Sequence, residues 1–269
     1  MSHYFKNFPI TSYNFKDDVN SRTVIVDIFR NARADFKIDD AAAYTFYEIQ
    51  ENERPDQISQ MFYDTPEYFW TFFIINDHLY EGMHAWPKGY NELIEFITEK
   101  YQKTFITSYI NSGQSGTNHL LFDKFTVGET ITGNETGHTA TISKIDVVMN
   151  RLEITNATGT FSTDTVITGS SSGDTLNSST QYDFSVENQI NAAHHYENID
   201  GIEIPRTLFS KGETEVFEVT HREFEEKLND SRQQIKVLKR GFIEDFARAY
   251  KKLINQWSNL VYIQQILQA

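Results

Sequence analysis

The sequence contains no cysteine, so neither a disulfide bond nor a metal site built on thiolates can form. Positive charge is also scarce, because 38 acidic residues face 24 basic ones and the formal net charge is −14. Sequence-independent binding to nucleic acid depends on Lys and Arg side chains that displace counterions from phosphates. We therefore expect no nucleic-acid partner.

Long apolar runs and a secretory leader are missing too. The apolar run Tyr68–Ile75 has eight residues, whereas a membrane-spanning helix needs roughly 20. The first residues, MSHYFKNFPI, lack the basic segment followed by an apolar one that a signal peptide has. We expect no membrane partner and synthesis in the cytoplasm.

Motifs that carry chemistry are absent as well. The sequence has no phosphate-binding loop, no dinucleotide fingerprint and no nucleophile elbow. None of its acidic residues stands in a motif that marks a catalytic pair of carboxylates. His194, His195 and Glu197 are candidate metal ligands, but adjacent side chains point in different directions on a helix or a strand, so we expect ordinary hydrogen-bonding histidines. The sequence predicts no enzyme activity, no cofactor and no metal site.

Aromatic residues, in contrast, are abundant. With 21 Phe and 14 Tyr among 269 residues, the chain has a rich supply of core and interface anchors. The length leaves room for two or three compact units.

The most informative stretch runs from Tyr44 to Asp77. Polar and apolar residues alternate from Tyr44 to Gln50, which predicts a strand. Pro55 then begins a helix whose apolar face carries Ile58, Met61 and Phe62. A second helix is expected from the Thr65-Pro66 start signal to Asp77, and it is apolar on nearly all sides, so other elements must cover it.

The order strand, helix, helix resembles a LysM-type module, in particular through PDQI from Pro55, TPEYFW from Thr65 and the closing Asn76-Asp77. With Val26–Ile38 before it and Met83–Pro87 after it, the stretch is similar to the baseplate wedge subunit with a LysM-like domain in T-even-type contractile-tail bacteriophages. A second stretch, Leu228–Phe246, resembles the same subunit. The resemblance covers roughly residues 24–102 and 215–257.

A repeat marks the middle of the chain. FTVGETITGNETGHTA from Phe125 and FSTDTVITGSSSGDTL from Phe161 align without gaps at a spacing of 161 − 125 = 36 residues. Each copy reads as two strands around a glycine-bounded turn, and Arg151–Ile154 supplies a further strand. We expect a small β-barrel or sandwich of two related hairpins.

Helical patterns return on either side of the repeat. Tyr90, Leu93, Ile94 and Ile97 predict a helix over 89–102, and Thr220 with Glu223 forms a capping box. Arg232–Lys239 fits either the end of a helix or a short strand, and Gly241 is expected to break it. An apolar stripe then predicts a helix through Phe242, Phe246, Ala249, Tyr250, Leu253, Ile254 and Trp257.

These patterns and the resemblance together predict an α+β protein with a LysM-like βααβ core, flanking helices, an inserted small all-β domain and a C-terminal helical segment. The predicted parts are an N-terminal arm (1–40), a LysM-like domain with its following helix (41–104), a linker (105–120), a β-rich insertion with the repeat (121–182), a connecting segment (183–215) and a C-terminal helical region (216–269).

The resemblance implies a structural subunit of the virion tail baseplate, synthesised in the host cytoplasm, that clamps neighbouring wedges around the central hub. Implied partners are other wedge proteins, hub proteins and a ring like the sheath initiator, in multiple copies under sixfold symmetry. The alternative is a tail protein that binds, or less plausibly degrades, peptidoglycan through a groove near Glu51–Asp56 and His78–Glu81. Candidate interface anchors, each of which can instead pack only in its own core, are Phe29, Phe36, Trp86, Phe242, Phe246, Tyr250 and Trp257.

Overall fold

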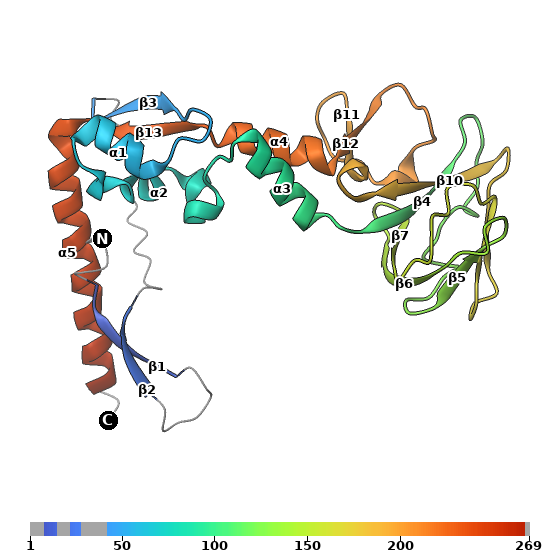
Figure 1. Ribbon diagram of the computed structural model, residues 1–269, viewed down its shortest axis with the longest axis horizontal. Helices are drawn as coiled ribbons and strands as arrows, with labels where there is room; N and C mark the ends of the chain where they lie inside the picture. Colours follow the sequence, from blue (N-terminus) through green and yellow to red (C-terminus); the bar gives the residue numbers. More distant parts are fainter. Residues whose placement is uncertain (1–7, 15–21, 28–41, 267–269) are drawn as a thin grey trace. The chain divides into compact units, whose positions relative to one another are not determined.

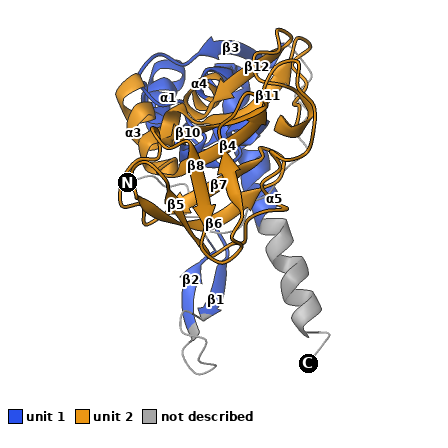
Figure 2. Ribbon diagram, turned by 90° about the vertical axis from the view of Figure 1, so that its right-hand side faces the viewer, with its two compact units in different colours: residues 1–89, 229–269 blue, residues 90–228 orange. Residues whose placement is uncertain are grey.

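A computed structural model describes residues 8–14, 22–27 and 42–266, without the side chains of Asn14, Arg22 and 255–266. The chain divides into two compact units, which are described separately (Figures 1 and 2). Unit 1 combines residues 1–89 with 229–269, and unit 2 is the continuous stretch 90–228. The structure is 29% helix and 30% strand, which agrees with the α+β prediction.

Unit 1 is built on a two-stranded antiparallel sheet whose strands come from distant parts of the chain. Strand β3 (Tyr44–Glu48) pairs with β13 (Gln234–Leu238), and Tyr47 lies opposite Ile235. Helices α1 (Pro55–Tyr63), α2 (Thr71–Ile75) and α5 (Arg240–Ile266) complete the unit, together with the 3-10 turns η2 (Pro66–Tyr68), η3 (Asp77–Leu79) and η4 (Gly82–His84). A separate hairpin of β1 (Ile10–Asn14) and β2 (Arg22–Val26) precedes them.

Helix α1 begins at Pro55 as predicted. The Gln57 side chain accepts a hydrogen bond from the Arg54 backbone N–H at 3.0 Å, which satisfies a group left unpaired at the helix start. Ile58 and Tyr63 are buried, but Met61, expected on the same face, is 54% exposed. The spacing of apolar residues predicted a buried Met61. The prediction was wrong because the buried face of α1 is narrower than the stripe of apolar residues along it.

The second predicted helix is broken into two pieces. The buried Ser59 hydroxyl donates to the Thr65 carbonyl at 2.7 Å and accepts from the Tyr68 backbone N–H at 3.2 Å, so residues 66–68 form a 3-10 turn. The α-helical part therefore starts only at Thr71. The prediction of one continuous helix was wrong because the Ser59 side chain of α1 holds the backbone of residues 66–68 in a 3-10 conformation.

The strand that closes unit 1 comes from the other end of the chain. The βααβ prediction needs a second strand after the two helices, but the segment that follows α2 directly contains the 3-10 turns η3 and η4 instead. Strand β13 takes that place instead, which resolves the ambiguity of Arg232–Lys239 in favour of a strand. Gly241 does not break an element, since it lies in the first turn of α5.

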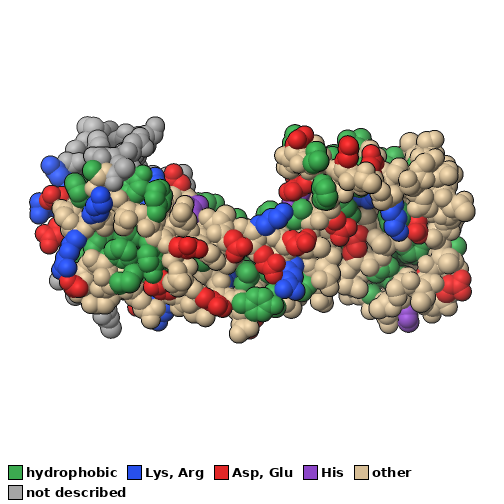
Figure 3. All heavy atoms as spheres, turned by 90° about the horizontal axis from the view of Figure 1, so that it is seen from above, with side chains coloured by type: hydrophobic (Ala, Val, Ile, Leu, Met, Phe, Trp, Pro, Cys, Tyr) green, Lys and Arg blue, Asp and Glu red, His purple; other side chains and the backbone are tan. Residues whose placement is uncertain are grey.

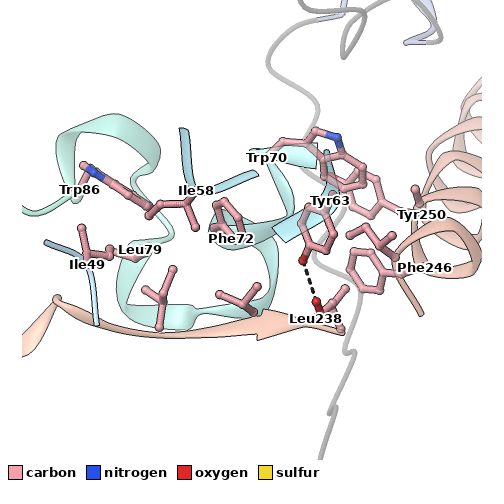
Figure 4. Packing of buried hydrophobic residues seen from close by; sticks show 14 of the residues in the cluster. Ile49, Ile58, Tyr63, Trp70, Phe72, Leu79, Trp86, Leu238, Phe246 and Tyr250 are labelled. Atoms are coloured by element: carbon pink, nitrogen blue, oxygen red, sulfur yellow. Dashed lines mark hydrogen bonds between the residues drawn. The ribbon is translucent and has the colours of Figure 1, made fainter. Parts of the chain in front are cut away.

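Two buried side chains, Asn76 and Tyr63, tie β13 to the helical part of unit 1. The Asn76 amide donates to the carbonyls of Phe72 at 2.8 Å and Lys236 at 3.0 Å, and its oxygen accepts from the Lys236 backbone N–H at 2.8 Å. The Tyr63 hydroxyl donates to the Leu238 carbonyl at 2.9 Å (Figure 4). These bonds hold an outer strand against helices that lie about 160 residues earlier.

Unit 2 contains a seven-stranded sheet in the order β10-β4-β7-β6-β5-β8-β9. The first and last strands are neighbours in sequence, joined by the turn at residues 178–181, so the sheet curls until its edges approach. The strands are β4 (Thr104–Ile110), β5 (Thr130–Gly133), β6 (Thr139–Asp146), β7 (Arg151–Thr155), β8 (Val166–Gly169), β9 (Thr175–Asn177) and β10 (Tyr182–Asn188).

The remaining elements of unit 2 flank this sheet. They are α3 (Tyr90–Lys100), the antiparallel pair β11 (Ala193–Asn198) and β12 (Val216–Thr220), α4 (His221–Ser231), which runs into unit 1, and the 3-10 turns η5 (Gln189–Asn191) and η6 (Arg206–Leu208). The predicted helix over 89–102 is confirmed as α3, and the capping box is confirmed, since Thr220 and Glu223 exchange hydrogen bonds at 2.8 and 3.2 Å.

Three ranges differ from their expected character. The range 105–120, expected to be a linker, begins with the buried strand β4, and 183–215 contains most of β10 and all of β11. The range 216–269 contains two strands beside its helices. Of these two strands, β12 pairs with β11 and β13 pairs with β3.

The two repeats are related by an approximate twofold axis. Strands β5 and β8 pair with Thr132 opposite Thr168, and these two residues are equivalent in the repeat. Each repeat supplies a carboxylate that caps the turn of the other: Asp164 accepts from two backbone N–H groups of residues 135 and 136, and Glu129 accepts from those of residues 171 and 172. A Cβ at Gly133 or Gly169 would collide with these carboxylates, which explains both repeated glycines.

Replacing Asn76 by Ala should lower the free energy of unfolding of unit 1 by about 2–4 kcal/mol, because three hydrogen bonds are lost and buried backbone groups stay unpaired. The three Trp residues all lie in unit 1, so urea unfolding followed by Trp fluorescence reports on this unit. The exposed Gln60→Ala variant is the control and should stay within about 0.5 kcal/mol of the parent. An equal effect of both variants would contradict this account.

Replacing Asp164 by Asn should destabilise unit 2 by about 1–3 kcal/mol near pH 7, because the turn of the first repeat loses a charged acceptor. Burial raises the pKa of Asp164, but hydrogen bonds from Thr136 and Glu135 outweigh it and hold the pKa below its ordinary value. This stabilisation is present above the ordinary pKa and disappears as the pH falls through the lowered one, so the difference between the proteins should shrink in acid. Unit 2 has no Trp, so its unfolding is the change in far-UV circular dichroism that is not accompanied by a change in Trp fluorescence. The exposed Asp123→Asn variant is the control.

Candidate protein-interaction site

An aromatic stack joins the broken second helix of unit 1 to α5. The rings of Trp70 and Tyr250 lie 4.9 Å apart at 29°, and Phe246 lies 6.2 Å from Trp70 at 26° (Figure 4). All three side chains are at least 90% buried. The break at residues 66–70 thus sets Trp70 against the helix that follows β13.

A pocket of about 320 Å³ opens beside this stack. Its apolar wall is formed by aromatic and aliphatic side chains from before β1, from the second helix and from α5. Four charged side chains complete it, two acidic and two basic. The lining residues are Phe8, Glu67, Tyr68, Trp70, Glu244, Ala247, Arg248, Tyr250, Lys251 and Ile254.

The mixed charge gives the pocket its polar character. Burial, followed by the negative charges of Glu244 and Glu67, raises the pKa of Tyr68, so its hydroxyl stays protonated and remains a donor. Arg248 pairs with Asp245 at 3.0 Å on the solvent side of α5. An apolar floor with a charged rim, and with Trp, Tyr and Arg present, is the composition of binding hot spots.

The structure brings together two of the seven predicted anchors. Phe246 and Tyr250 lie in the stack, and Tyr250 lines the pocket. Phe242, one turn earlier on α5, is 48% exposed. Phe29, Phe36 and the side chain of Trp257 lie outside the described part of the chain.

Trp86 packs inside unit 1, away from the pocket lining. Its ring lies 5.6 Å from that of Phe73, and its indole N–H donates to the Glu53 carbonyl at 2.8 Å. Only 6% of the residue is exposed. In the described structure its contacts are therefore those of a core residue.

Sequence reasoning did not select Trp70 or Tyr68. Both belong to the run Tyr68–Ile75, which is apolar except for Thr71, so no aromatic residue in it stands out by spacing. The capping signal at Thr65-Pro66 was visible, but the bond from Ser59 that breaks the helix depends on tertiary packing. No local sequence pattern marks the charged residues of the pocket rim as part of a site.

The segments expected to line a glycan groove make contacts within unit 1. The Glu53 carboxylate accepts from the Tyr47 hydroxyl at 2.8 and 2.9 Å and from the Gln50 backbone N–H at 3.0 Å. Burial of the His78 side chain lowers its pKa below the ordinary value. The pocket beside α5 is lined by none of the residues 51–56 or 78–81.

The histidines of β11 also have internal partners. His195 lies 2.7 Å from the Glu197 carboxylate and 2.8 Å from a ring nitrogen of His194, which stacks on Phe224 at 3.8 Å. Within the described residues no three His, Asp or Glu side chains form a group that could hold a metal ion. Among the helices that the structure describes, none combines the length and apolarity needed to cross a membrane.

These features define the class of the protein. It has two compact units, and its candidate binding site is an aromatic pocket with a charged rim. Residues 4–112 match the model of a phage family described as Base plate wedge protein 53. No curated protein matches the chain. The family match supports a structural role in a phage baseplate wedge, a place in the virion tail baseplate, and assembly with other baseplate proteins.

The match covers one of the two stretches in which a resemblance was noted. Residues 24–102 lie within it, whereas 215–257, the repeat and all of α5 lie outside it. Six of the ten residues that line the pocket come from α5, so the match reaches only the wall formed before residue 112.

The buried His221 predicts acid sensitivity of unit 2. Its ring stacks on Tyr101 at 4.0 Å, and neither ring nitrogen has a hydrogen-bond partner in the described part of the chain. Burial, then the positive charges of Arg151 and His194, lowers the pKa of His221 to about 4. Below pH 6.5 the unfolded chain binds this proton first, so stability should fall by up to about 3 kcal/mol between pH 6.5 and 4.

Replacing His221 by Phe should remove this part of the pH dependence while keeping the stack on Tyr101. Denaturation of unit 2, followed by far-UV circular dichroism at several pH values, measures the slope. The exposed His84→Phe variant should keep the parent slope. An unchanged slope in His221→Phe would show that other groups cause the sensitivity.

Proposed function

We propose that this protein is a non-catalytic structural subunit that clamps neighbouring baseplate wedges together around the central hub of a T-even-type contractile tail. The observation that carries the proposal is the family match over residues 4–112. The subunit is present in multiple copies around a sixfold axis and contacts other wedge proteins, hub proteins and a ring like the sheath initiator.

The division into two units supports a clamp. Unit 1 has its own hydrophobic core around Ile58, Phe72 and Tyr250, and unit 2 has another around Ile131, Leu152 and Phe161. The chain passes between the units twice, at residues 89–90 and 228–229. Each unit therefore keeps a folded surface of its own, and the two surfaces can bind different neighbours.

Unit 1 offers the pocket beside α5. Its aromatic floor suits an apolar or aromatic anchor from a neighbouring protein, and its acidic and basic rim residues suit complementary charges around that anchor. Unit 2 offers apolar side chains that are more than half exposed on and near β11 and β12, namely Ile199, Ile202, Leu208 and Phe217.

The surface charge indicates the chemistry of the partners. Acidic side chains are visible on both units in Figure 3, in keeping with the net charge of −14. Partner surfaces rich in Lys and Arg would associate faster and more selectively with acidic surfaces of this kind.

Unit 1 is a LysM-like core under this proposal. It has the order strand, helix, helix, strand, with β3, α1, α2 and β13, but 139 residues of unit 2 precede the last strand. A core that is interrupted in this way, with its groove segments in internal contacts, suits a scaffold better than a detachable glycan-binding module.

The pocket can be tested with a matched pair of variants. Lys251 lines the pocket, while the adjacent Lys252, which is also exposed, does not. In reconstitution with the other wedge proteins, Lys251→Glu should lower the yield of joined wedges at least tenfold, because it reverses a charge at the contact, and Lys252→Glu should stay within about twofold. Sedimentation and electron microscopy of the assemblies measure the yield.

A further variant tests the face next to the pocket. Phe242→Asp adds a charge at an exposed position and should block joining without unfolding unit 1, whereas Phe246 is too buried for a comparable test. Trp fluorescence verifies the fold of each variant. Normal joining by Lys251→Glu and Phe242→Asp would overturn the role of this site, and tight binding of the chain to peptidoglycan without binding to wedge proteins would overturn the clamp.

A further inference from the structure

Strand β12 has one edge with which no other strand of the described structure pairs. It forms a two-stranded sheet with β11 in unit 2 (Figure 1), so β11 covers one of its two edges. The far edge of β11 is covered as well, because the Asn198 N–H donates to the Ile202 carbonyl at 3.0 Å. The Ile204 N–H donates to the Tyr196 carbonyl at 2.8 Å. In the described part of the chain, this small sheet is therefore open along β12.

The same bonds show which backbone groups of β12 point outwards. Along an antiparallel strand, the N–H and C=O of one residue point to the same side, and successive residues alternate. The Tyr196 and Asn198 groups point away from β12, so those of Glu197 between them point towards it. Glu197 lies opposite Phe217, whose N–H and C=O therefore point towards β11. The residues before and after Phe217 turn theirs to the open edge.

Those residues are Val216 and Glu218, and their outward N–H and C=O groups have no hydrogen-bond partner within the described residues. The next outward N–H, that of Thr220, is occupied, because it donates to the Glu223 carboxylate at 2.8 Å. Phe217 is 52% exposed, and Glu218 is exposed beside it. The edge thus offers backbone donors and acceptors to an extended chain, next to an exposed aromatic ring.

The side chains along this edge are acidic. Residues 212–221 include Glu213, Glu215 and Glu218 but neither Lys nor Arg. Among the described ion pairs none involves Glu218, whose carboxylate accepts from the Tyr196 hydroxyl at 3.4 Å. Partial burial, followed by the negative charge of Glu187, raises the pKa of the Glu218 carboxyl group. An incoming cation would therefore stabilise the carboxylate at the centre of the edge.

We propose that β12 binds an extended segment of another baseplate protein as an additional strand, and that basic and apolar residues alternate along that segment. Side chains directly opposite each other in neighbouring strands share a face of the sheet. A Lys or Arg of the segment would face Glu218, and the apolar residue next to it would face Phe217 on the other side. In such strand addition, backbone hydrogen bonds supply affinity and alternate side chains supply selectivity.

A second copy of this chain fits the edge less well. Its own β12 would bring the three carboxylates of residues 212–221 against the same three, and like charges on an edge strand oppose such pairing. The source of the segment, a baseplate protein, rests on the proposed function, whereas the strand addition rests on β12 alone.

Amide hydrogen exchange, measured by NMR on the full-length chain, tests the strand addition without any wedge protein. The probe is the blocked peptide TKVKVKT, and the control is TVVKKKT, which has the same composition without the alternation. TKVKVKT should slow exchange of the Val216 and Glu218 amides at least about threefold. The Phe217 and Val219 amides already face β11 and should change less than about 1.5-fold. TVVKKKT should slow none of them.

Two variants at one position separate the charge from the backbone. Glu218→Gln keeps the outward N–H and should raise the dissociation constant of TKVKVKT about threefold through the lost charge. Glu218→Pro also removes the N–H, which β11 does not use, and should raise the constant at least about tenfold. The exposed Asp200→Asn variant, in the turn after β11, should change it less than about twofold. In wedge reconstitution, Glu218→Pro should lower the yield of joined wedges about tenfold.

Several results would overturn the inference. Equal effects of the two peptides, or of Glu218→Gln and Glu218→Pro, would reduce the contact to charge attraction. Slower exchange of the Val216 and Glu218 amides as the concentration of the chain rises, with no peptide present, would assign the edge to a second copy. If Glu218→Pro joins wedges normally while Lys251→Glu does not, β12 has no part in joining and the clamp stands.

Discussion

The pairing of β3 with β13 is the interaction on which the rest of unit 1 depends. Tyr47 and Ile235 lie opposite each other although nearly 190 residues separate them in sequence. Asn76 binds the outer strand to the helices, and Asn229 exchanges hydrogen bonds with the Lys88 backbone at 2.8 and 3.1 Å, where the chain leaves and re-enters the unit. The position of α5, and with it the aromatic stack and the pocket, follows from where β13 ends.

Local signals in the sequence were sufficient for much of this structure. The starts of α1 and α4, the extent of α3 and the pairs of strands in the repeat follow from capping residues, periodicity and glycine positions, which act within a few residues. What failed depends on distant partners. The break before Thr71 needs Ser59, and the strand character of residues 234–238 needs β3.

The sequence predicted only part of the candidate site, because the rest of the site also depends on contacts between distant residues. An apolar stripe on α5 identified Phe246 and Tyr250, but it also included Phe242 and Ala249, which are exposed, and omitted the buried Ile243. For an apolar face of this width, the sequence leaves the centre of the buried face uncertain by one residue until the element that packs against the helix is known. Trp70 supplies that partner, and the acidic and basic residues on the rim come from two segments, Glu67 beside the break and the rest from α5.

The interrupted layout of unit 1 has a consequence during synthesis. When a ribosome has completed residue 89, β3 has no pairing partner and the apolar run Tyr68–Ile75 has no α5 against it. The 139 residues of unit 2 must be added first, which takes roughly 10–30 s at bacterial rates of elongation. During that interval the nascent segment 1–89 exposes the open edge of β3. Prompt folding of unit 2, which brings residues 90 and 228 into one compact body, therefore shortens the period of risk for aggregation.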